Sequence, residues 1–366
     1  MLGGNYMEGK TRKMFPGGNT SKGFKSFFNY AIPKDANIIF CMKGGPGVGK
    51  SSLMKKVAKE MIERGYDVDL YPCSSDPDSL DVIVIKKLGA VMLDATAPHI
   101  VDPKNPGAID EILDLGMFWN REGIEINRDK IVECNKEVSR FFKVGFSYFE
   151  SAAPIAYEIQ SKNVDCMDFG KVNLVTSQLI YDIFKNIKPS ENYKEARHLF
   201  GSALSPLGHV EFTDTILEDI DKVYYLNGEI GTGKTTLLNK VVNKAVENGL
   251  EVEVFHAPLL PEKIETIVLK DLNISITTSK LFESDNFEII DLNQFLDKDM
   301  QEKYKNELEF SQNTLDNLVS YGLLNIRKAK EEHDKLEKFY IPNMNFEEVN
   351  KLKDLIVDRI IKYDEN

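Results

Sequence analysis

The chain has little of what would place it in several common protein classes. It has four cysteines, Cys41, Cys73, Cys134 and Cys166, and no C-x-x-C spacing among its 366 residues. We therefore expect neither a disulfide framework nor structural zinc. We expect the compartment to be a reducing cytoplasm. The chain contains no run of about 18 apolar residues, so the sequence predicts no membrane-spanning helix. The start of the chain lacks the basic-then-apolar layout of a signal peptide.

Positive charge is also in short supply. The chain has 46 Lys and Arg against 58 Asp and Glu, a formal net charge of −12. This excess of acid argues against broad affinity for nucleic acid, and we see no clear nucleic-acid signal. Most of the charges are of mixed sign and are expected on solvated helix faces. With 42% apolar residues, the chain has room for two hydrophobic cores.

Two segments carry the strongest positive signal. Residues 44–51 read G-G-P-G-V-G-K-S and residues 228–235 read G-E-I-G-T-G-K-T, and both match G-x-x-x-x-G-K-[ST]. Each follows a strand-like apolar run and opens an amphipathic stretch. Glycines in such a loop let consecutive backbone N–H groups converge on phosphate oxygens, and the helix N-terminus behind them adds positive potential. Both segments therefore predict binding of a nucleoside triphosphate.

The motif gives each residue type a role. We expect Lys50 and Lys234 to reach the β- and γ-phosphates, and the hydroxyls of Ser51 and Thr235 to ligate Mg²⁺. No N-K-x-D tetrapeptide for reading guanine is present, which favours ATP over GTP. The residues expected to bind nucleotide are Gly44, Gly45, Pro46, Gly47, Val48, Gly49, Lys50, Ser51 and Ser52 in the first loop, and Gly228, Glu229, Ile230, Gly231, Thr232, Gly233, Lys234, Thr235 and Thr236 in the second.

The whole chain is consistent with a duplication. Lys50 and Lys234 are 184 residues apart (234 minus 50), and at that offset identical residues coincide without a gap between residues 65 and 88. Such self-similarity predicts two copies of one fold. We expect two tandem P-loop NTPase domains, residues 1–190 and 191–366, each an α/β unit with a mostly parallel sheet flanked by helices. The second copy is expected to have a degenerate site.

Within a copy, the order strand, loop, helix, strand predicts a βαβ unit and a parallel sheet. Pro77 and Pro261 suit the first turn of a further helix, which would lead to a third strand at residues 89–93 and at its counterpart. Residues 128–161 and 299–338 then have apolar positions at helical spacing among many charges. We expect them to form a long helical hairpin appended to each domain, packed on that domain or on its twin.

Hydrolysis requires a carboxylate that orients Mg²⁺ and a group that orients the attacking oxygen. Asp94 ends the apolar strand 90–93, the Walker B position, and is the candidate metal ligand. No glutamate follows it, so the residue that primes water in many ATPases is missing from its usual place. At the 184-residue offset Thr278 replaces Asp94, which predicts that the second loop binds nucleotide without turnover. A slip of one residue in this register would let Glu283 or Asp285 serve instead.

Further candidate residues lie near the ends of the first copy's strands. Asp76 is a candidate general base or water-positioning group, and it equally suits an N-cap before Pro77. Asp81 has an acidic counterpart in Glu265, which suits an ion pair or a helix face as well as chemistry. His99 has three interpretations: contact with phosphate, orientation of water, or packing.

Arg12 and Arg197 occur in both copies just ahead of the first strand, each with an aromatic residue three positions later. An arginine donated across the interface between copies would stabilise charge developing on the γ-phosphate. The alternative is a structural ion pair beside a buried phenylalanine.

Several segments together carry a family resemblance. They are residues 18–24 (G-N-T-S-K-G-F), the first loop, residues 73–81 (C-S-S-D-P-D-S-L-D), residues 94–99 (D-A-T-A-P-H) with Asp102-Pro103, and the second loop. On these segments the chain resembles a family of duplicated P-loop ATPase-like proteins from spore-forming Gram-positive bacteria, over nearly its full length. The resemblance implies the duplicated fold and ATP binding, and says little about the chemistry.

Three functions are compatible with these residues. The leading one is a cytoplasmic ATPase with Lys50, Ser51 and Asp94 in its active site and the second loop as a binding or regulatory site. The alternative is a kinase that transfers the γ-phosphoryl to a nucleotide or small metabolite, with Asp76 as base; the missing glutamate favours it. The third is a nucleotide-gated interaction protein with negligible turnover and an unidentified partner. Completion of the sites within one chain or by a homodimer stays open.

Overall fold

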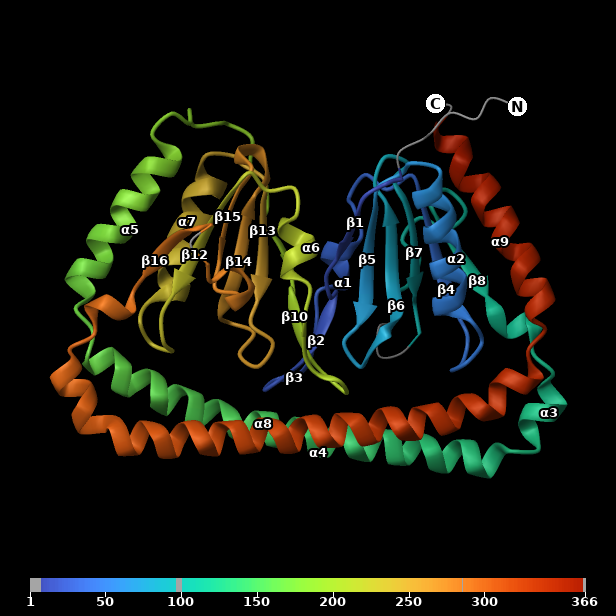
Figure 1. The fold of residues 1–366 in the computed structure, drawn as a ribbon. Coiled ribbons are helices and arrows are strands. Elements are labelled where there is room, and N and C mark those ends of the chain that lie inside the picture. The colour runs from blue at the N-terminus through green and yellow to red at the C-terminus, as the bar shows by residue number, and fades with distance from the viewer. Residues whose placement is uncertain (1–7, 97–100, 285, 365–366) are drawn as a thin grey trace.

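The computed structural model describes residues 8–96, 101–284 and 286–364. Each repeat forms a six-stranded mixed sheet, and the two sheets stand side by side (Figure 1). The first sheet has, in spatial order, β1 (Thr11–Lys13), β5 (Val68–Cys73), β6 (Asp76–Ile85), β7 (Ala90–Asp94), β4 (Ile38–Lys43) and β8 (Asp110–Asp114). The second has β9 (Arg197–Leu199), β13 (Val252–His256), β14 (Ile264–Leu269), β15 (Ile274–Thr277), β12 (Lys222–Asn227) and β16 (Glu288–Asp291).

The two sheets share order and register. Ile38 pairs with Ala90 in the first sheet, and Lys222 pairs with Ile274 in the second, which are the positions that the 184-residue offset superposes. β4 runs parallel to β7, as predicted, and also to β8, a strand that the sequence did not predict. Residues 38–42 of β4 are buried throughout because helices and the other layers cover both faces of a central parallel strand. The predicted duplication of the α/β fold is therefore seen in the sheets.

The predicted helix at Pro77 and Pro261 is wrong. Pro77 is the second residue of β6, which runs antiparallel to both β5 and β7, and Pro261 lies in the turn before β14. Proline is tolerated near the start of a strand, where its missing N–H breaks no central ladder bond. The buried, β-branched run at residues 82–85 then continues the strand. The sheet is consequently mixed rather than parallel throughout, and Asp76 is not a helix N-cap.

The predicted helices after the loops are present as α2 (Lys50–Glu63) and α7 (Lys234–Glu247). Small elements fill the space between the sheets: the hairpins β2 (Gly17–Thr20) with β3 (Gly23–Ser26) and β10 (Ser202–Ser205) with β11 (Gly208–Glu211), and the short helices α1 (Phe28–Ala31) and α6 (Thr213–Leu217). Phe15 and Phe200 exchange backbone hydrogen bonds of 2.8 and 3.1 Å between the repeats. One hydrophobic core extends across this junction and contains Met14 and Tyr71 of the first repeat with Leu199 and Phe255 of the second.

The two long helices pair with each other. α4 (Arg128–Asp165), preceded by α3 (Arg121–Glu125), and α8 (Lys298–Tyr340) run antiparallel beneath both sheets (Figure 1). They approach closely where a Cβ on Gly322 would lie 2.3 Å from the Phe149 ring and one on Gly145 would lie 3.0 Å from Ile326. The structure thus has one long helical pair shared by the repeats, where a hairpin for each repeat was expected.

The helices that follow are exchanged between the repeats. α5 (Phe169–Phe184) packs on α7 of the second sheet, and α9 (Phe346–Ile361) packs on α2 of the first (Figure 1). Ile356 and Ile360 of α9 share a core with Met54 and Met61 of α2. Each α/β unit is therefore completed by a helix from the other repeat.

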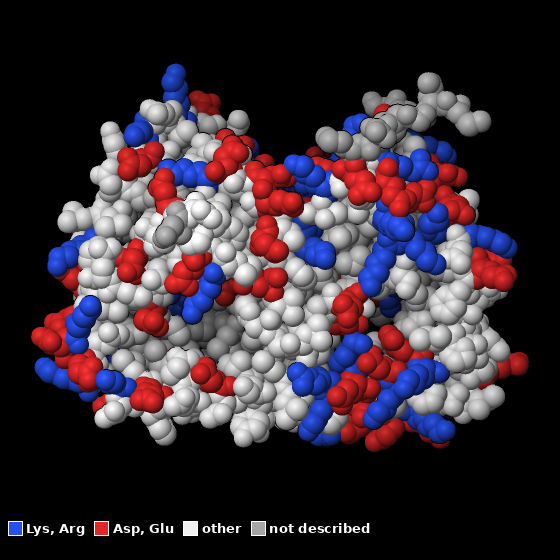
Figure 2. All heavy atoms as spheres, in the orientation of Figure 1, with Lys and Arg blue, Asp and Glu red and all other residues white. Residues whose placement is uncertain are grey.

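Among the described residues, no helix is both long enough and apolar enough to span a bilayer. Lys, Arg, Asp and Glu side chains are interspersed over the face shown in Figure 2. Many charges on the long helices pair within one turn, as Arg140 does with Glu137 and Lys305 with Glu302. Such exposed pairs contribute little to stability individually.

Candidate functional site

The first loop, residues 44–49, connects the end of β4 to the start of α2. Gly49 is the N-cap residue of α2 and has φ of 94°, a left-handed conformation that glycine adopts without strain. Because glycine has no capping side chain, the first N–H groups of α2 face the loop without a partner from the N-cap residue. A Cβ on Gly44 would lie 2.8 Å from the Val48 side chain, so the turn also needs glycine there. The backbone has the form that an anion-binding loop requires.

Lys50 and Asp94 lie together at this loop. Lys50 Nζ donates to the carbonyls of Gly44 at 2.6 Å and Gly45 at 3.2 Å, and lies 3.3 Å from Asp94 Oδ2. Asp94 ends β7 opposite Met42 of β4, so the parallel register brings it beside the loop. Its other oxygen accepts from the Thr96 backbone N–H at 2.9 Å, which fixes the carboxylate.

Ser51 and Asp81 lie near each other, in the first turn of α2 and on β6. Ser51 Oγ, in the first turn of α2, accepts from the Leu80 N–H at 2.9 Å. Asp81 is 7% exposed, and burial together with the charges of Asp94 and Asp76 raises its pKa to about 8. Sequence reasoning gave Asp81 no specific role. The available signal was an acidic residue at the same position of both copies, directly before an apolar β-branched run.

Asp76 starts β6 at the same edge of the sheet. Its Oδ2 accepts from Ser79 Oγ at 2.7 Å and lies 3.5 Å from Lys330 Nζ, which belongs to α8 of the second repeat. Asp76, Asp81 and Asp94 therefore gather near Lys50 and Ser51. His99 lies outside the described residues.

These residues fit the requirements of an Mg²⁺–phosphate site. Among the described residues, no group of three or more His, Cys, Asp or Glu side chains forms a protein-only metal cage. Mg²⁺ at phosphate sites is held by one or two protein ligands together with phosphate oxygens and water. The Ser51 hydroxyl and the Asp94 carboxylate are side chains of that kind at the loop.

The second loop repeats the backbone but differs in its charges. Gly231 and Gly233 both have φ of 99°, and Lys234 Nζ donates to the carbonyls of Gly228 and Glu229. Burial lowers the pKa of Lys234 to about 8. The strand register holds without a slip, so Thr278 follows β15 at the place that Asp94 has in the first repeat.

Of the two alternative carboxylates, the structure describes only Glu283, which does not take the place of Asp94. Glu283 ends a short turn and interacts with Tyr225, and Asp285 lies outside the described residues. Glu265, the counterpart of Asp81, accepts from Ser202 Oγ at 2.7 Å, and removal from water raises its pKa to about 7. The second site therefore has a carboxyl at the Asp81 position and a threonine at the Asp94 position.

Each loop is in contact with the long helix of the other repeat. A Cβ on Gly45 would lie 3.0 Å from Tyr340 Cε1, and one on Gly47 would lie 3.2 Å from the carbonyl oxygen of Glu337 in α8. In the second repeat, Asn163 Nδ2 of α4 donates to the Ile230 carbonyl at 2.8 Å. Both sites are thus built from both repeats.

The arginine candidates lie away from the loops. Arg12 Nη2 and Arg197 Nη1 each lie 2.6 Å from a carboxylate oxygen of Glu253, whose side chain is fully buried between the repeats. Their strands, β1 and β9, are each four strands from the strand that precedes the loop of the same repeat, a separation of roughly 19 Å at ~4.8 Å per strand. The structure places both arginines in an ion pair that joins the repeats.

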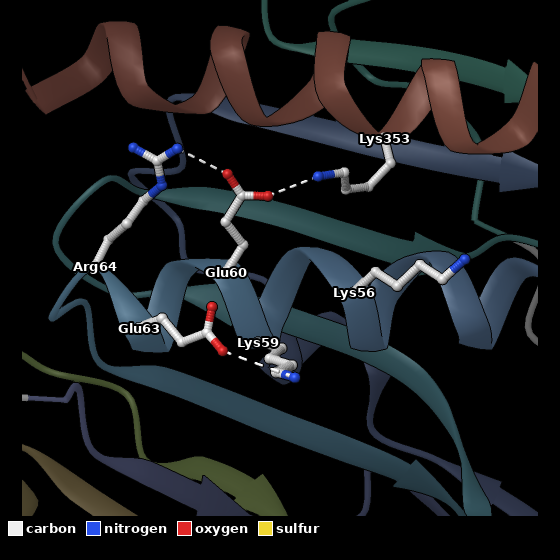
Figure 3. Close-up of a pocket in the computed structure, with 6 residues that line it drawn as sticks. All are labelled: Lys56, Lys59, Glu60, Glu63, Arg64 and Lys353. Atoms are coloured by element: carbon white, nitrogen blue, oxygen red, sulfur yellow. Dashed lines mark hydrogen bonds and ion pairs between the residues drawn. The ribbon is translucent and has the colours of Figure 1, made fainter.

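A surface recess of about 520 Å³ lies between α2 and α9 (Figure 3). Its lining comes from the stretch between Lys56, in the middle of α2, and the C-cap residue Arg64, and from Lys353 of α9. Glu60 lies 2.7 Å from both Arg64 and Lys353, and Lys59 pairs with Glu63 at 3.7 Å. The paired charges indicate a contact between α2 and the exchanged helix α9, and not a ligand site.

Comparison with protein-family models, with curated proteins and with solved structures finds no match to this chain.

Proposed function

We propose that this chain binds ATP with Mg²⁺ at its first loop and hydrolyses it there, and that the second loop binds nucleotide without turnover. The observation that carries the proposal is the group formed by Lys50, Ser51 and Asp94 at a glycine loop. Lys50 Nζ lies 3.3 Å from Asp94 Oδ2, and Ser51 follows in the first turn of α2.

Phosphoryl transfer depends mainly on positioning and on stabilising charge, so each group has a defined task. The loop N–H groups and Lys50 would bind the β- and γ-phosphates. Ser51 and Asp94 would hold Mg²⁺, which neutralises charge on the phosphate oxygens when bound. Asp76 would orient the attacking water. Asp81, whose pKa is raised to about 8, would accept or hold a proton near neutral pH.

The difference between the two loops supports different tasks for them. Both have the glycines and the lysine, but Thr278 replaces the Asp94 carboxylate in an unbroken register. A threonine in that place supplies no charge for a metal ion. The second loop would therefore bind a nucleotide and regulate or stabilise the assembly, without efficient turnover.

One observation favours a second candidate, a nucleotide-gated interaction protein. Tyr340 and Glu337 contact the first loop from α8, and Asn163 contacts the second from α4. Nucleotide binding at either loop would then bias the long helices that the repeats share. This candidate predicts tight binding, negligible turnover and a change of shape. Small-angle scattering that is identical with and without ATP would count against it.

The test of the main proposal is Mg²⁺-dependent phosphate release from ATP, with Lys50→Ala and Lys234→Ala compared with the wild type. We expect release to vanish in Lys50→Ala and to persist in Lys234→Ala. Equal losses in both variants would refute the assignment of turnover to the first loop. ATP binding without release would favour the nucleotide-gated candidate, and release of ADP only with an added acceptor would favour a kinase.

A further inference from the structure

A lysine of the second repeat lies next to the first site. Lys330 Nζ, on α8, lies 3.5 Å from Asp76 Oδ2, and both side chains are about one-quarter exposed, at 24% and 27%. The same lysine pairs with Asp334 one turn further along the helix. The end of α8 packs on the first loop through Glu337 and Tyr340, and this packing holds Lys330 next to Asp76.

A short series of contacts links Lys330 to the residues proposed to hold nucleotide. Asp76 accepts from Ser79 Oγ at 2.7 Å, and the next residue, Leu80, donates its N–H to Ser51 Oγ at 2.9 Å. Along α8, Lys330 is seven residues before Glu337, or about 10 Å at ~1.5 Å per residue. The segment 330–340 therefore extends from Asp76 to the backbone of the loop.

The lysine is specific to the first site. The long helices correspond at an offset of 177 residues. Gly322 and Gly145 (322 minus 145) both lie at the helix crossing. At the same offset, Phe346 and Phe169 (346 minus 169) each lie against a loop glycine. At that offset the counterpart of Lys330 is Ala153 of α4. The other repeat thus places the cationic side chain of Lys330 at the first site and the methyl side chain of Ala153 at the corresponding position of the second.

The negative charges of the first site explain why a cation is placed there. The carboxylates of Asp76 and Asp94 would repel each other and an incoming polyphosphate. Burial opposes the charge on Lys330, but the hydrogen bond to Asp334 and the charge of Asp76 together raise its pKa. Lys330 therefore remains a cation next to Asp76 at neutral pH.

We propose that Lys330 is a positioning residue for the first site, supplied by the second repeat, which holds the Asp76 carboxylate in place to orient the attacking water. The proposal rests on the function proposed above. Turnover at the first loop would then depend on one side chain of the second repeat. This dependence does not require a nucleotide at the second loop.

The test compares ATP turnover and ATP affinity in Lys330→Met, which keeps the length of the side chain and removes its charge. We expect kcat to fall about 10- to 100-fold with KM within about threefold, because general-base contributions of ~10²–10⁴ would be partly lost while binding is retained. Lys330→Arg should recover most of kcat. Lys335→Met, the same change at a lysine of α8 that pairs with Glu332 of its own helix, is the matched control and should leave kcat unchanged.

A double-mutant cycle with Asp76→Asn identifies the route of the effect. If Lys330 acts through Asp76, Lys330→Met should cause no further loss in the Asp76→Asn background. Wild-type turnover that survives Lys330→Met, or losses that multiply in the double variant, would overturn this inference alone. Absence of Mg²⁺-dependent turnover in the wild type would overturn the proposed function as well. Thermal unfolding of each variant checks that the fold is retained.

Discussion

The ring of Tyr340, at the end of α8, lies against the backbone of Gly45 in the first loop, so that a Cβ on Gly45 would be 3.0 Å from Tyr340 Cε1. The ring centroids of Tyr340 and Trp119 are 6.1 Å apart. Trp119 is the only tryptophan in the chain. The second loop has Asn163 in the place of Tyr340. The tryptophan emission of the protein therefore comes from a side chain that is one ring away from the first loop.

We expect ATP with Mg²⁺ to change the emission of Trp119. Phosphate binding would draw Lys50 away from the Gly44 and Gly45 carbonyls, and any movement of Gly45 acts on Tyr340. A fluorescence titration should show saturation in the wild type and in Lys234→Ala, and no response in Lys50→Ala. A response that disappears with Lys234→Ala but persists in Lys50→Ala would contradict the prediction.

We expect Asp94→Asn to lower kcat by on the order of 10²-fold, the cost of removing one preorganised electrostatic group from an active site. Asparagine can still accept the Thr96 N–H bond, so the loop should keep its conformation while the charge for Mg²⁺ is lost. Phosphate release measured over a range of Mg²⁺ concentrations should also show a higher midpoint. Thr278→Ala, at the corresponding position of the second repeat, is the control and should have no effect. Equal activity of Asp94→Asn and the wild type would refute the metal-ligand role.

The duplicated sheets were predictable because the local signals and the tertiary structure agree. An apolar run, a glycine loop and an amphipathic helix at one offset predict two copies, and the register of β7 on β4 then places Asp94 beside Lys50. Where local and tertiary preferences disagree, the prediction failed. Asp76 before Pro77 has the pattern of a helix start, but the β-branched residues 82–85 pair between β5 and β7 and extend the strand.

The exchange of helices could not be predicted from the sequence. The apolar positions of α8 show which face is buried, but a hydrophobic face fits a core of either repeat. Lys330 consequently looked like one of many charges on an exposed helix, and its contact with Asp76 follows only from the three-dimensional arrangement. Asp81 was likewise visible as an acidic residue, but its burial depends on the neighbouring strand β7 and on α2.

We expect Glu253→Gln to destabilise the junction between the repeats by about 3–5 kcal/mol, because it leaves Arg12 and Arg197 without their buried counter-charge. The two arginines and Lys270 hold the pKa of Glu253 well below its usual range, against the effect of burial. Glu251→Gln is the control, since Glu251 is an exposed partner of Lys270 and its loss should cost under ~1 kcal/mol. Urea midpoints of both variants measure the difference. Comparable midpoints would show that the buried carboxylate does not hold the repeats together.

The raised pKa of Asp81 predicts a pH dependence of stability. Its pKa is about 8 in the folded chain against an ordinary value of 3.8, so between these values the folded state keeps a proton that the unfolded state has lost. The contribution to stability is therefore fully present below pH 4 and is lost as the pH rises toward 8. Asp81→Asn mimics the neutral side chain and removes this loss. We expect the variant to be more stable than the wild type at pH 8 by on the order of 3 kcal/mol, at ~1.4 kcal/mol per pKa unit over half of the shift.

The measurement for Asp81 is the urea midpoint of wild type and Asp81→Asn at several pH values from about 4 to 8. Other titrating groups, Glu265 among them, occur in both proteins, so the difference between the two isolates Asp81. Asp78→Asn, an exposed change on the same strand, is the matched control for the loss of one carboxylate. A gap between Asp81→Asn and the wild type that stays constant, or that widens toward acid, would show that Asp81 is ionised in the folded chain. Asp81 would then add a third negative charge beside Asp76 and Asp94, and the role of Lys330 in balancing those charges would become larger.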